Sequence, residues 1–401
     1  MVARIAVVGA GIAGLAGAVA LQRRGHAVTV FEARADTAAG TAITLWPNAL
    51  AALDELGLGD AVRDAGNRVP TGAVRWRDGR PLRRPDPHRL VDALGEPLVV
   101  LRRPVLTGLL GDALAPGTVR TGQAVTGLRL TGSGGGGRVR VLLADGTEHR
   151  VDAVVGADGV RSTVAAWLNG PLRHRYAGYT AWRGIAEHPL DPALSGETLG
   201  PAAQFGHVRL DADHTYWFAT ERTAAGGSAP EGELAYLRRR FAGWAEPVPT
   251  LLARTDPAAV LRTDLYDREQ ARVWAAGPVV LVGDAAHPMR PHLGQGGCQG
   301  LEDVAVLARC IDLCGGDGEG RTDGLTAAFA RYARRRRRRV GAVVRESAVI
   351  GRVINIRPSW VGAAAVRASA LLPDAVANRH LATIAARSAL RLPDPVEVRA
   401  L

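Results

Sequence analysis

Cysteine is scarce in this chain of 401 residues, and its three copies stand close together at Cys298, Cys310 and Cys314. They are too few and too clustered for a disulfide framework, and their spacing is not Cys-x-x-Cys. We therefore expect a reducing, cytoplasmic location. The ten histidines are scattered without the spacing of metal ligands, which argues against a metal centre.

Long hydrophobic runs are also missing, with one exception. The run from Ile5 to Gln22 carries no charge and has almost the length of a membrane span. Its glycines at positions 9, 11 and 14, however, fall at the spacing of a nucleotide-binding turn. We interpret the run as a strand and a helix of a globular domain, and we expect no membrane partner.

Lysine is absent, so that all 50 basic residues are arginine, and the formal net charge is +11. Such a charge would suit a nucleic-acid-binding protein. Much of the excess, however, lies in the run Arg334–Arg339, whose apolar flanks predict a long helix with a solvated basic face. No known recognition pattern or series of stacking aromatics accompanies it, so we expect no nucleic-acid partner.

The first 15 residues read as a strand, a turn and the start of a helix. The turn has the pattern Gly9-x-Gly11-x-x-Gly14, and a second apolar run ends on Glu32. A carboxylate about 20 residues past such a turn meets the hydroxyls of an adenosine ribose. This combination predicts a dinucleotide site, and the acid disfavours a tightly held ligand with a 2′-phosphate.

The most informative segment runs from Pro278 to Asp303. A β-branched run ends there in Gly283-Asp284, and a loop rich in proline and glycine leads into an apolar, helix-like stretch. An acid at the end of a strand can accept hydrogen bonds from sugar-alcohol hydroxyls. The glycines at 294, 296 and 297 leave bare N–H groups at the amino end of the next helix, where they can meet a carbonyl-rich ring.

A third strand-to-helix turn carries Asp158-Gly159 and Arg161, and alone it is an ordinary βα turn. In this order and spacing, the three turns resemble the single-component flavoprotein monooxygenases of the aromatic-hydroxylase type, over about residues 1–345. Shorter matches support the resemblance, namely Trp46-Pro-Asn48, Arg103-Pro-Val-Leu106 and the stretch from Tyr176 to Arg183. The subgroup of urate hydroxylase, 3-hydroxybenzoate hydroxylase and zeaxanthin-epoxidase-like enzymes is the most similar.

This resemblance implies bound FAD, with NADPH or NADH as a transient reductant. Oxygen transfer through a flavin hydroperoxide would hydroxylate or epoxidise an aromatic, heteroaromatic or olefinic small molecule. Asp284 and Arg103 would contact the ribityl and pyrophosphate region, Asp158 would serve flavin and NAD(P)H handling with Arg161, and His287 would have a structural role. The expected FAD contacts are Gly9, Gly11, Ala13, Gly14, Glu32, Ala33, Thr44, Arg103, Val125, Asp158, Asp284, Pro291, Gly294, Gln295, Gly296, Gly297 and Cys298.

The implied fold is α/β, with a Rossmann-like FAD-binding domain, an inserted β-rich substrate domain of α+β type and a C-terminal helical segment. We expect the FAD-binding domain at 1–70, 98–170 and 272–345, the substrate domain at 71–97 and 171–271, and helices broken by prolines at 346–401. The glycine tract at Ser133–Gly137 predicts a flexible hairpin tip.

The substrate is expected between the flavin ring and the inserted sheet. Its candidate contacts are Arg183, Arg209, Tyr179, Tyr216 and Trp217. Aromatic side chains on such a sheet more often form its core, whereas a buried arginine requires a partner. Cys298 is expected to pack beside the flavin rather than to react.

Other functions stay open. A flavin-dependent oxidase, dehydrogenase or halogenase could use the same scaffold, although no Trp-x-Trp-x-Ile segment of the halogenases occurs. A basic flavin-binding interaction protein could use the arginine run. The expected partner is a small aromatic or natural-product-like substrate, and the expected state is a monomer or a homodimer.

Overall fold

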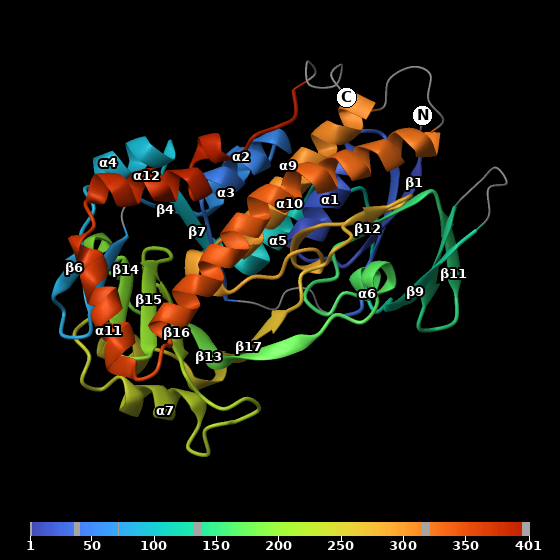
Figure 1. Cartoon of the computed structure of the whole chain (residues 1–401). Helices are drawn as coiled ribbons and strands as arrows, with labels where there is room; N and C mark the ends of the chain where they lie inside the picture. The colour runs from blue at the N-terminus through green and yellow to red at the C-terminus, as the bar shows by residue number, and fades with distance from the viewer. Residues whose placement is uncertain (1, 36–40, 71, 132–137, 315–320, 395–401) are drawn as a thin grey trace.

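The computed structural model describes residues 2–35, 41–70, 72–131, 138–314 and 321–394. The hairpin tip predicted at Ser133–Gly137 lies outside these residues. The described strands form two large sheets and two small ones, against which the helices pack (Figure 1). The α/β class predicted from the sequence is confirmed.

A six-stranded sheet carries the first glycine turn. Its order is β18 (Ala275–Ala276), β19 (Val279–Leu281), β12 (Ala153–Gly156), β1 (Arg4–Val8), β2 (Ala27–Phe31) and β8 (Val119–Arg120). All neighbours are parallel except β18 and β19. The central strands are almost wholly buried runs of Val, Ile and Ala, as expected of a parallel sheet that is covered on both faces.

Three long helices pack beside this sheet: α1 (Ile12–Gln22), α9 (Gly296–Cys314) and α10 (Arg321–Ile354). The middle one, α9, contacts both of the others. Most of α1 is buried, which explains its uncharged composition. Among the described residues, no helix combines the length and the apolar character that a membrane crossing needs.

A seven-stranded sheet forms the second large layer. Its order is β17 (Leu261–Arg268), β13 (His174–Ala186), β16 (Thr215–Glu221), β15 (Ala203–Arg209), β14 (Gly196–Gly200), β5 (Ala73–Trp76) and β6 (Pro81–Arg83). Two helices, α7 (Glu233–Arg240) and α8 (Val248–Ala253), cover one face, where Trp182, Phe205 and Trp217 form an aromatic core. The other face carries Tyr216 and Phe218, which pack against a cluster that includes Val100 and Val343. We call it the open face because Phe218 and other side chains on it keep some exposed surface.

Two three-stranded sheets and shorter helices complete the fold. The sheets are β3 (Ala42–Leu45), β7 (Leu98–Arg102) with β4 (Asn67–Val69), and β11 (Glu148–Val151), β10 (Val139–Leu143) with β9 (Val125–Leu130). The helices are α2 (Pro47–Glu55), α3 (Gly59–Ala65), α4 (Pro87–Leu94), α5 (Arg103–Asp112), α6 (Thr163–Asn169), α11 (Ser359–Ala368) and α12 (Asp374–Ala385). The last two begin directly after Pro358 and Pro373, where breaks were predicted.

The two large sheets draw their strands from the ranges that the sequence analysis separates. The six-stranded sheet uses 1–70, 98–170 and 272–345, and the seven-stranded sheet uses 71–97 and 171–271. The β-rich ranges also contain α4, α7 and α8. The limits of the domains themselves stay a prediction.

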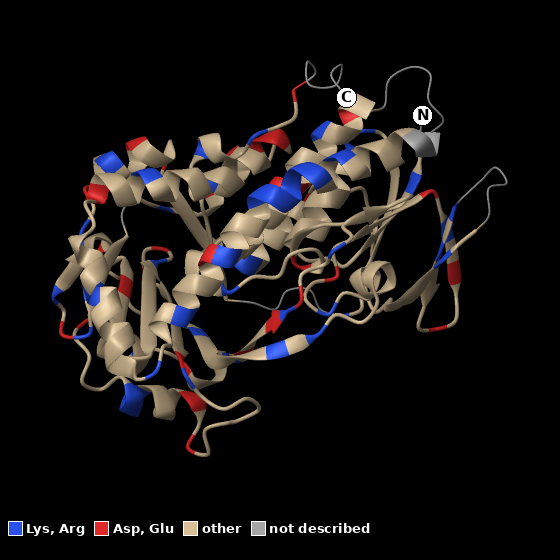
Figure 2. Cartoon of the chain, viewed as in Figure 1, with Lys and Arg blue, Asp and Glu red and all other residues tan. Residues whose placement is uncertain are grey.

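The sequence predicts that the arginines of the run Arg334–Arg339 form a solvated face of a long helix. This prediction is wrong for two of the six. Arg336 is 2% exposed, and the side chain of Arg339 is 22% exposed. Position 336 falls on the stripe of Phe329, Tyr332 and Val340, so the helical period turns it inward. The basic segments of α10 stand out in Figure 2.

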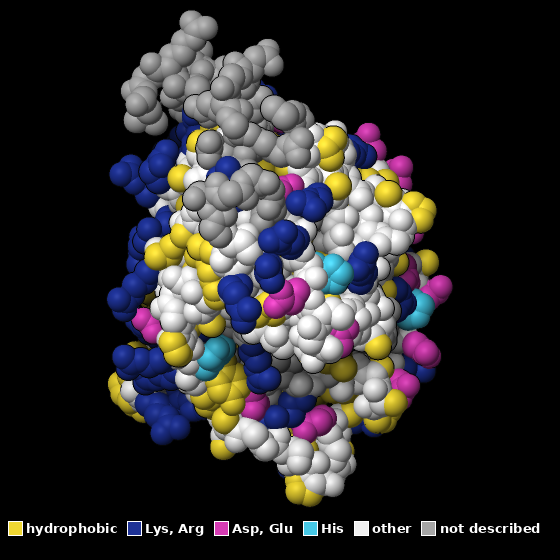
Figure 3. All heavy atoms as spheres, turned by 90° about the vertical axis from the view of Figure 1, so that its right-hand side faces the viewer, with side chains coloured by type: hydrophobic (Ala, Val, Ile, Leu, Met, Phe, Trp, Pro, Cys, Tyr) yellow, Lys and Arg dark blue, Asp and Glu magenta, His cyan; other side chains and the backbone are white. Residues whose placement is uncertain are grey.

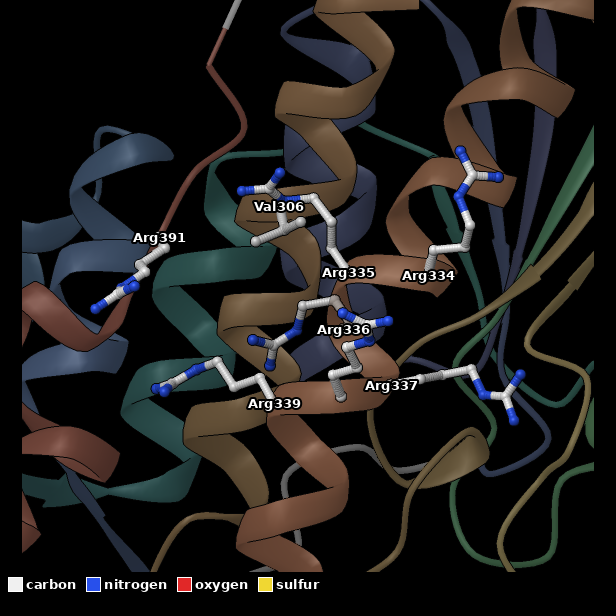
Figure 4. A pocket seen from close by; sticks show the side chains of 8 residues that line it. Val306, Arg334, Arg335, Arg336, Arg337, Arg339 and Arg391 are labelled. Carbon is white, nitrogen blue, oxygen red and sulfur yellow. The ribbon is translucent and has the colours of Figure 1, made fainter. Parts of the chain in front are cut away.

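The other arginines of the run remain at the surface. Arg334 and Arg337 extend to the side of α10 away from Arg391 (Figure 4). Val306, the six arginines and Arg391 line a cavity of about 980 Å³. On the face shown in Figure 3, basic side chains gather along the left edge, whereas the right edge carries acidic and basic side chains together.

Candidate active site

The turn after β1 contains two glycines that larger residues could not replace, Gly9 and Gly14. Gly9 has a φ of +100°, and a Cβ there would lie 2.5 Å from the carbonyl oxygen of Ala157. A Cβ on Gly14 would lie 2.0 Å from the carbonyl oxygen of Gly9. By contrast, no heavy atom lies within 4 Å of a Cβ on Gly11, which precedes α1 without a side-chain cap. Bare N–H groups at such an open helix start can bind phosphate.

Glu32 lies beside this turn at the end of β2. Its Oε2 accepts a hydrogen bond from the N–H of Ala10 at 2.8 Å, and its Oε1 accepts one from the N–H of Arg34 at 2.9 Å. These bonds hold the carboxylate next to the glycines, as contact with ribose hydroxyls requires. The neighbouring Ala33 is exposed.

Asp284 and Arg103 are accessible to solvent although protein surrounds them. Both residues have exposed surface. Nevertheless, desolvation raises the pKa of Asp284 and lowers the pKa of Arg103. The positive charge of Arg103 opposes the first shift, and the negative charge of Asp284 opposes the second. A carboxylate and a guanidinium thus lie near each other beyond the end of β19, within reach of a polar ligand.

Arg268 was missed by the sequence analysis. It is 4% exposed at the end of β17, and its Nη2 donates to the carbonyl oxygen of Ala285 at 2.8 Å. Its Nε and Nη1 have no partner among the described residues. Burial lowers the pKa of Arg268, whereas the negative charges of Asp284 and Asp158 act to raise it. A buried guanidinium with two unused donors fits an anionic group such as a phosphate. No motif marks this arginine in the sequence.

The loop after Asp284 presents the start of α9. The chain turns at Gly294, which has a φ of +61°, and the helix begins at Gly296. The first turn of α9 contains no acid, so its N–H groups and positive dipole end are not neutralised. Pro291 and Gly297 are partly accessible. The helix start predicted for contact with a carbonyl-rich ring is therefore present.

A buried charge network lies behind this loop. Arg336 contacts Glu302 at 2.5 Å and Asp303 at 2.7 Å, and the three side chains are at most 3% exposed. Arg339 places a second guanidinium 2.7 Å from Glu302. Burial alone would raise the pKa of both carboxyls, but the arginines, together with His287 at Asp303, hold these pKa values below the ordinary range.

Asp303 fixes the turn that carries Asp284. Its Oδ2 accepts a hydrogen bond from the N–H of Gly283 at 2.8 Å and lies 2.5 Å from Nε2 of His287. His287 is fully buried in this contact. Such a position is consistent with the structural role that the resemblance implies for it.

Glu302 fixes the loop on the other side. Its Oε1 accepts a hydrogen bond from Nδ2 of Asn48 at 2.6 Å, and the same nitrogen donates to Oε1 of Gln295 at 2.9 Å. Gln295 is 1% exposed and directly precedes α9. Arg336 therefore connects α10 to both turns of the candidate site through two carboxylates.

Asp158 is bound to its own turn. Its Oδ2 accepts hydrogen bonds from the N–H groups of Thr163 at 2.7 Å and Val164 at 3.2 Å, and its Oδ1 accepts one from the hydroxyl of Ser162 at 2.5 Å. Burial still raises the pKa of this carboxyl. The bonds hold the start of α6 in place, and Arg161 beside them is exposed.

The remaining predicted cofactor contacts differ in burial and packing. Ala13 packs against the later turn, since a Cβ on Gly283 would lie 3.0 Å from its methyl group. Thr44 and Val125 are partly accessible. Cys298 is fully buried, and burial raises the pKa of its thiol to about 12, which fits packing rather than thiolate chemistry.

Three of the five substrate candidates lie toward the cofactor region. Tyr216 is 7% exposed on the open face, and burial raises the pKa of its hydroxyl. Arg183 and Arg103 lie close enough for their positive charges to oppose this shift. Tyr179 is fully buried, and its hydroxyl lies 2.8 Å from Nε2 of His292 in the loop before α9.

The other two candidates lie elsewhere. Trp217 belongs to the aromatic core under α7 and α8, where its indole N–H donates to the hydroxyl of Thr255 at 2.9 Å. Arg209 has the same strand parity as Phe205, so it projects from the covered face, and its Nε donates to the carbonyl oxygen of Asp211 at 3.0 Å. We do not include either residue in the proposed substrate site.

The arrangement fits FAD at three points. The glycine turn beside Glu32 suits the adenosine diphosphate part. Arg268 offers unused buried donors near Asp158 and Asp284. The start of α9, whose first turn contains no acid, suits a ring that gains negative charge on reduction. The described residues contain no cluster of side chains able to hold a metal ion.

Comparisons with known proteins agree with this arrangement. A family model described as FAD binding domain matches residues 2–347. The aurachin C monooxygenase/isomerase of Stigmatella aurantiaca is 38% identical over 87% of this chain and 89% of its own length. The FAD-dependent urate hydroxylase of Mycolicibacterium vanbaalenii is 31% identical over 76% and 78%.

A solved structure shows the same fold. The Klebsiella pneumoniae protein HpxO, complexed with FAD and uric acid, superimposes with a TM-score of 0.84 at 27% identity, over 95% of this chain and 96% of its own. The family match and the identities extend over most of the chain. This protein therefore belongs to the FAD-dependent flavoprotein monooxygenases that the sequence resembles.

Proposed function

We propose that this monooxygenase hydroxylates or epoxidises an aromatic, heteroaromatic or olefinic small molecule held between the start of α9 and the open face of the seven-stranded sheet. One observation supports this placement. Arg183 and Tyr216 of the sheet lie within electrostatic reach of Arg103, which is itself influenced by Asp284. Groups of the open face and expected cofactor contacts thus meet in one region.

The chain's own residues would bind and orient the reactants. FAD, when bound, accepts hydride from NAD(P)H and activates O₂. Glu32 would accept hydrogen bonds from ribose hydroxyls, and Asp284 from the ribityl chain. The N–H groups at the start of α9 would stabilise negative charge on the ring. The contact between Tyr179 and His292 connects the seven-stranded sheet to the loop before α9. It would help to exclude water from the space between them.

The decisive assay is NADPH oxidation in the presence of labelled O₂. A panel of aromatic acids, purines and polycyclic natural-product precursors would be scored first by stimulated NADPH consumption. The product of the best compound should carry the label from O₂. Label from water would contradict the proposal, and peroxide without an oxygenated product would favour a flavin oxidase.

Three further properties can be measured. Steady-state kinetics with NADH and with NADPH would show which nucleotide the enzyme uses. The expected monomer or homodimer can be measured by light scattering after gel filtration. A cytoplasmic location stays a prediction that cell fractionation would test.

A further inference from the structure

One row of residues crosses the open face of the seven-stranded sheet. Arg183 of β13 lies opposite Phe218 of β16, Phe218 lies opposite Gly206 of β15, and Gly206 lies opposite Glu197 of β14. Directly opposed residues share a face, so these side chains project to the same side. Gly206 leaves room for the Phe218 ring, which a Cβ there would approach to 2.1 Å. The row therefore has a guanidinium, an aromatic ring and a carboxyl, in that order.

Accessibility separates this row from the face behind it. Arg183, Phe218 and Glu197 are all half-buried. Their neighbours on the covered face are closed off, since Trp182 is 1% exposed and Trp217 is fully buried. The side chains of the row therefore keep accessible surface that the residues behind it lack, although Phe218 also packs against a buried cluster.

The row also has a direction. Arg183 lies at its cofactor end, where its charge acts on Tyr216 and Arg103. Glu197 is three strands further along, which corresponds to about 14 Å at the usual strand spacing. An elongated aromatic molecule could thus have one end near the flavin and the other end at Glu197.

The Glu197 end offers acceptors that lack donors. Oε2 of Glu197 accepts a hydrogen bond from Nε2 of Gln204 at 2.8 Å, and its other oxygen has no hydrogen bond from the described residues. Gln204 is 2% exposed, and its buried Oε1 has no partner among them. Burial raises the pKa of the Glu197 carboxyl to about 7, and the hydrogen bond from Gln204 opposes this shift. A buried acceptor without a donor is costly, so this end favours a ligand that supplies N–H groups.

We propose that Glu197 and Gln204 are specificity residues that receive an amine or N–H group at the distal end of an elongated aromatic substrate. The aromatic part would lie on Phe218, and the end to be oxidised would lie beside Arg183. The inference rests on the proposed function and deepens it by naming the substrate class. A carboxylate at the distal end would be rejected, because it brings charge of the same sign as ionised Glu197.

The test uses the FAD-loaded protein and three probes of one shape. These are 4-phenylbenzylamine, 4-methylbiphenyl and biphenyl-4-carboxylate, with binding followed by equilibrium dialysis and by the flavin absorbance. The amine should bind wild type about tenfold more tightly than the methyl compound, and the carboxylate most weakly. Glu197→Gln should remove most of the preference for the amine and leave the methyl compound unaffected.

Two matched variants complete the test. Glu187→Gln removes the same charge from an exposed position directly after β13 and should keep the preference. Phe218→Leu should weaken all three probes by a similar factor. The inference is overturned if wild type does not prefer the amine, or if Glu197→Gln keeps that preference. Failure of the proposed function would instead appear as absent FAD uptake or as product label from water.

Discussion

Two clusters of enclosed polar groups, one behind the α9 loop and one on the open face, differ in how fully the chain itself pairs their carboxylates. Behind the loop, Arg336 contacts both Glu302 and Asp303, and each carboxylate has further donors. On the open face, Glu197 has a single side-chain hydrogen bond from the part of the chain that the structure describes, and Gln204 retains an acceptor that this part leaves unused.

The difference separates a structural role from a recognition role. A buried ion pair whose carboxylates are fully hydrogen-bonded costs much to break but need not add net stability, so its value here is to fix the two turns of the candidate flavin site. The side chains around the pair are less complete, since Asn48 Oδ1, His287 Nδ1 and Gln295 Nε2 have no partner among the described residues. A cluster with unused acceptors gains when a ligand supplies donors. The predictions below test this contrast.

The largest effect is expected for Arg336→Met. The substitution leaves Glu302 and Asp303 buried without the guanidinium that they share, so the free energy of unfolding should fall by about 3–5 kcal/mol. Urea unfolding followed by tryptophan fluorescence measures the change. A loss no larger than that of a surface arginine variant would show that the network is not the main connection between α9 and α10.

A large effect on the cofactor rather than on the fold is expected for Asp284→Ala. The residue is accessible, and none of its side-chain contacts is a hydrogen bond within the described chain. FAD affinity should fall by about tenfold or more, while the unfolding free energy stays close to that of wild type. Fluorescence titration with FAD and urea unfolding give the two values, and full FAD occupancy of the variant would contradict the site.

A smaller effect is expected for Glu197→Gln on the pH dependence of stability. The pKa of this carboxyl is about 7 in the folded protein against an ordinary 4.5, so the folded state binds more protons between these values. Stability should therefore be greatest at the acidic end of this window and should fall as pH rises toward 7, by roughly 1–2 kcal/mol after allowance for partial exposure.

The variant should lose this slope, because glutamine does not titrate. Thermal unfolding of both proteins at several pH values between these limits measures it. Parallel curves for wild type and variant would show that the carboxyl ionises normally in the folded protein.

The smallest effect is expected for Arg337→Gln. Arg337 belongs to the same arginine run, but it is exposed and points away from Arg391 (Figure 4). Its replacement should change the unfolding free energy by no more than about 0.5 kcal/mol. The variant is thus a control for Arg336→Met, and a loss of several kcal/mol would require a tertiary role for the exposed arginines as well.

Much of the cofactor region could be predicted because its constraints are local. Gly14 is required by a contact within its own turn and Gly9 by its φ of +100°. Glu32 and Asp284 follow strands that their own composition predicts. Arg336 could have been inferred, because it interrupts an apolar stripe at helical spacing. The uniform arginine run concealed that signal.

The sequence by itself determined the family, the α/β class and the turns that would hold FAD, because glycine spacing and strand ends act over a few residues. Only the tertiary structure decided which arginine of six meets Glu302 and Asp303, and that Arg268 lies near Asp158 and Asp284. It also decided that Trp217 and Arg209 project away from the open face while Glu197 shares a row with Arg183. The physical reason is that periodicity fixes the side on which a residue lies, whereas strand order and packing decide what that side contacts.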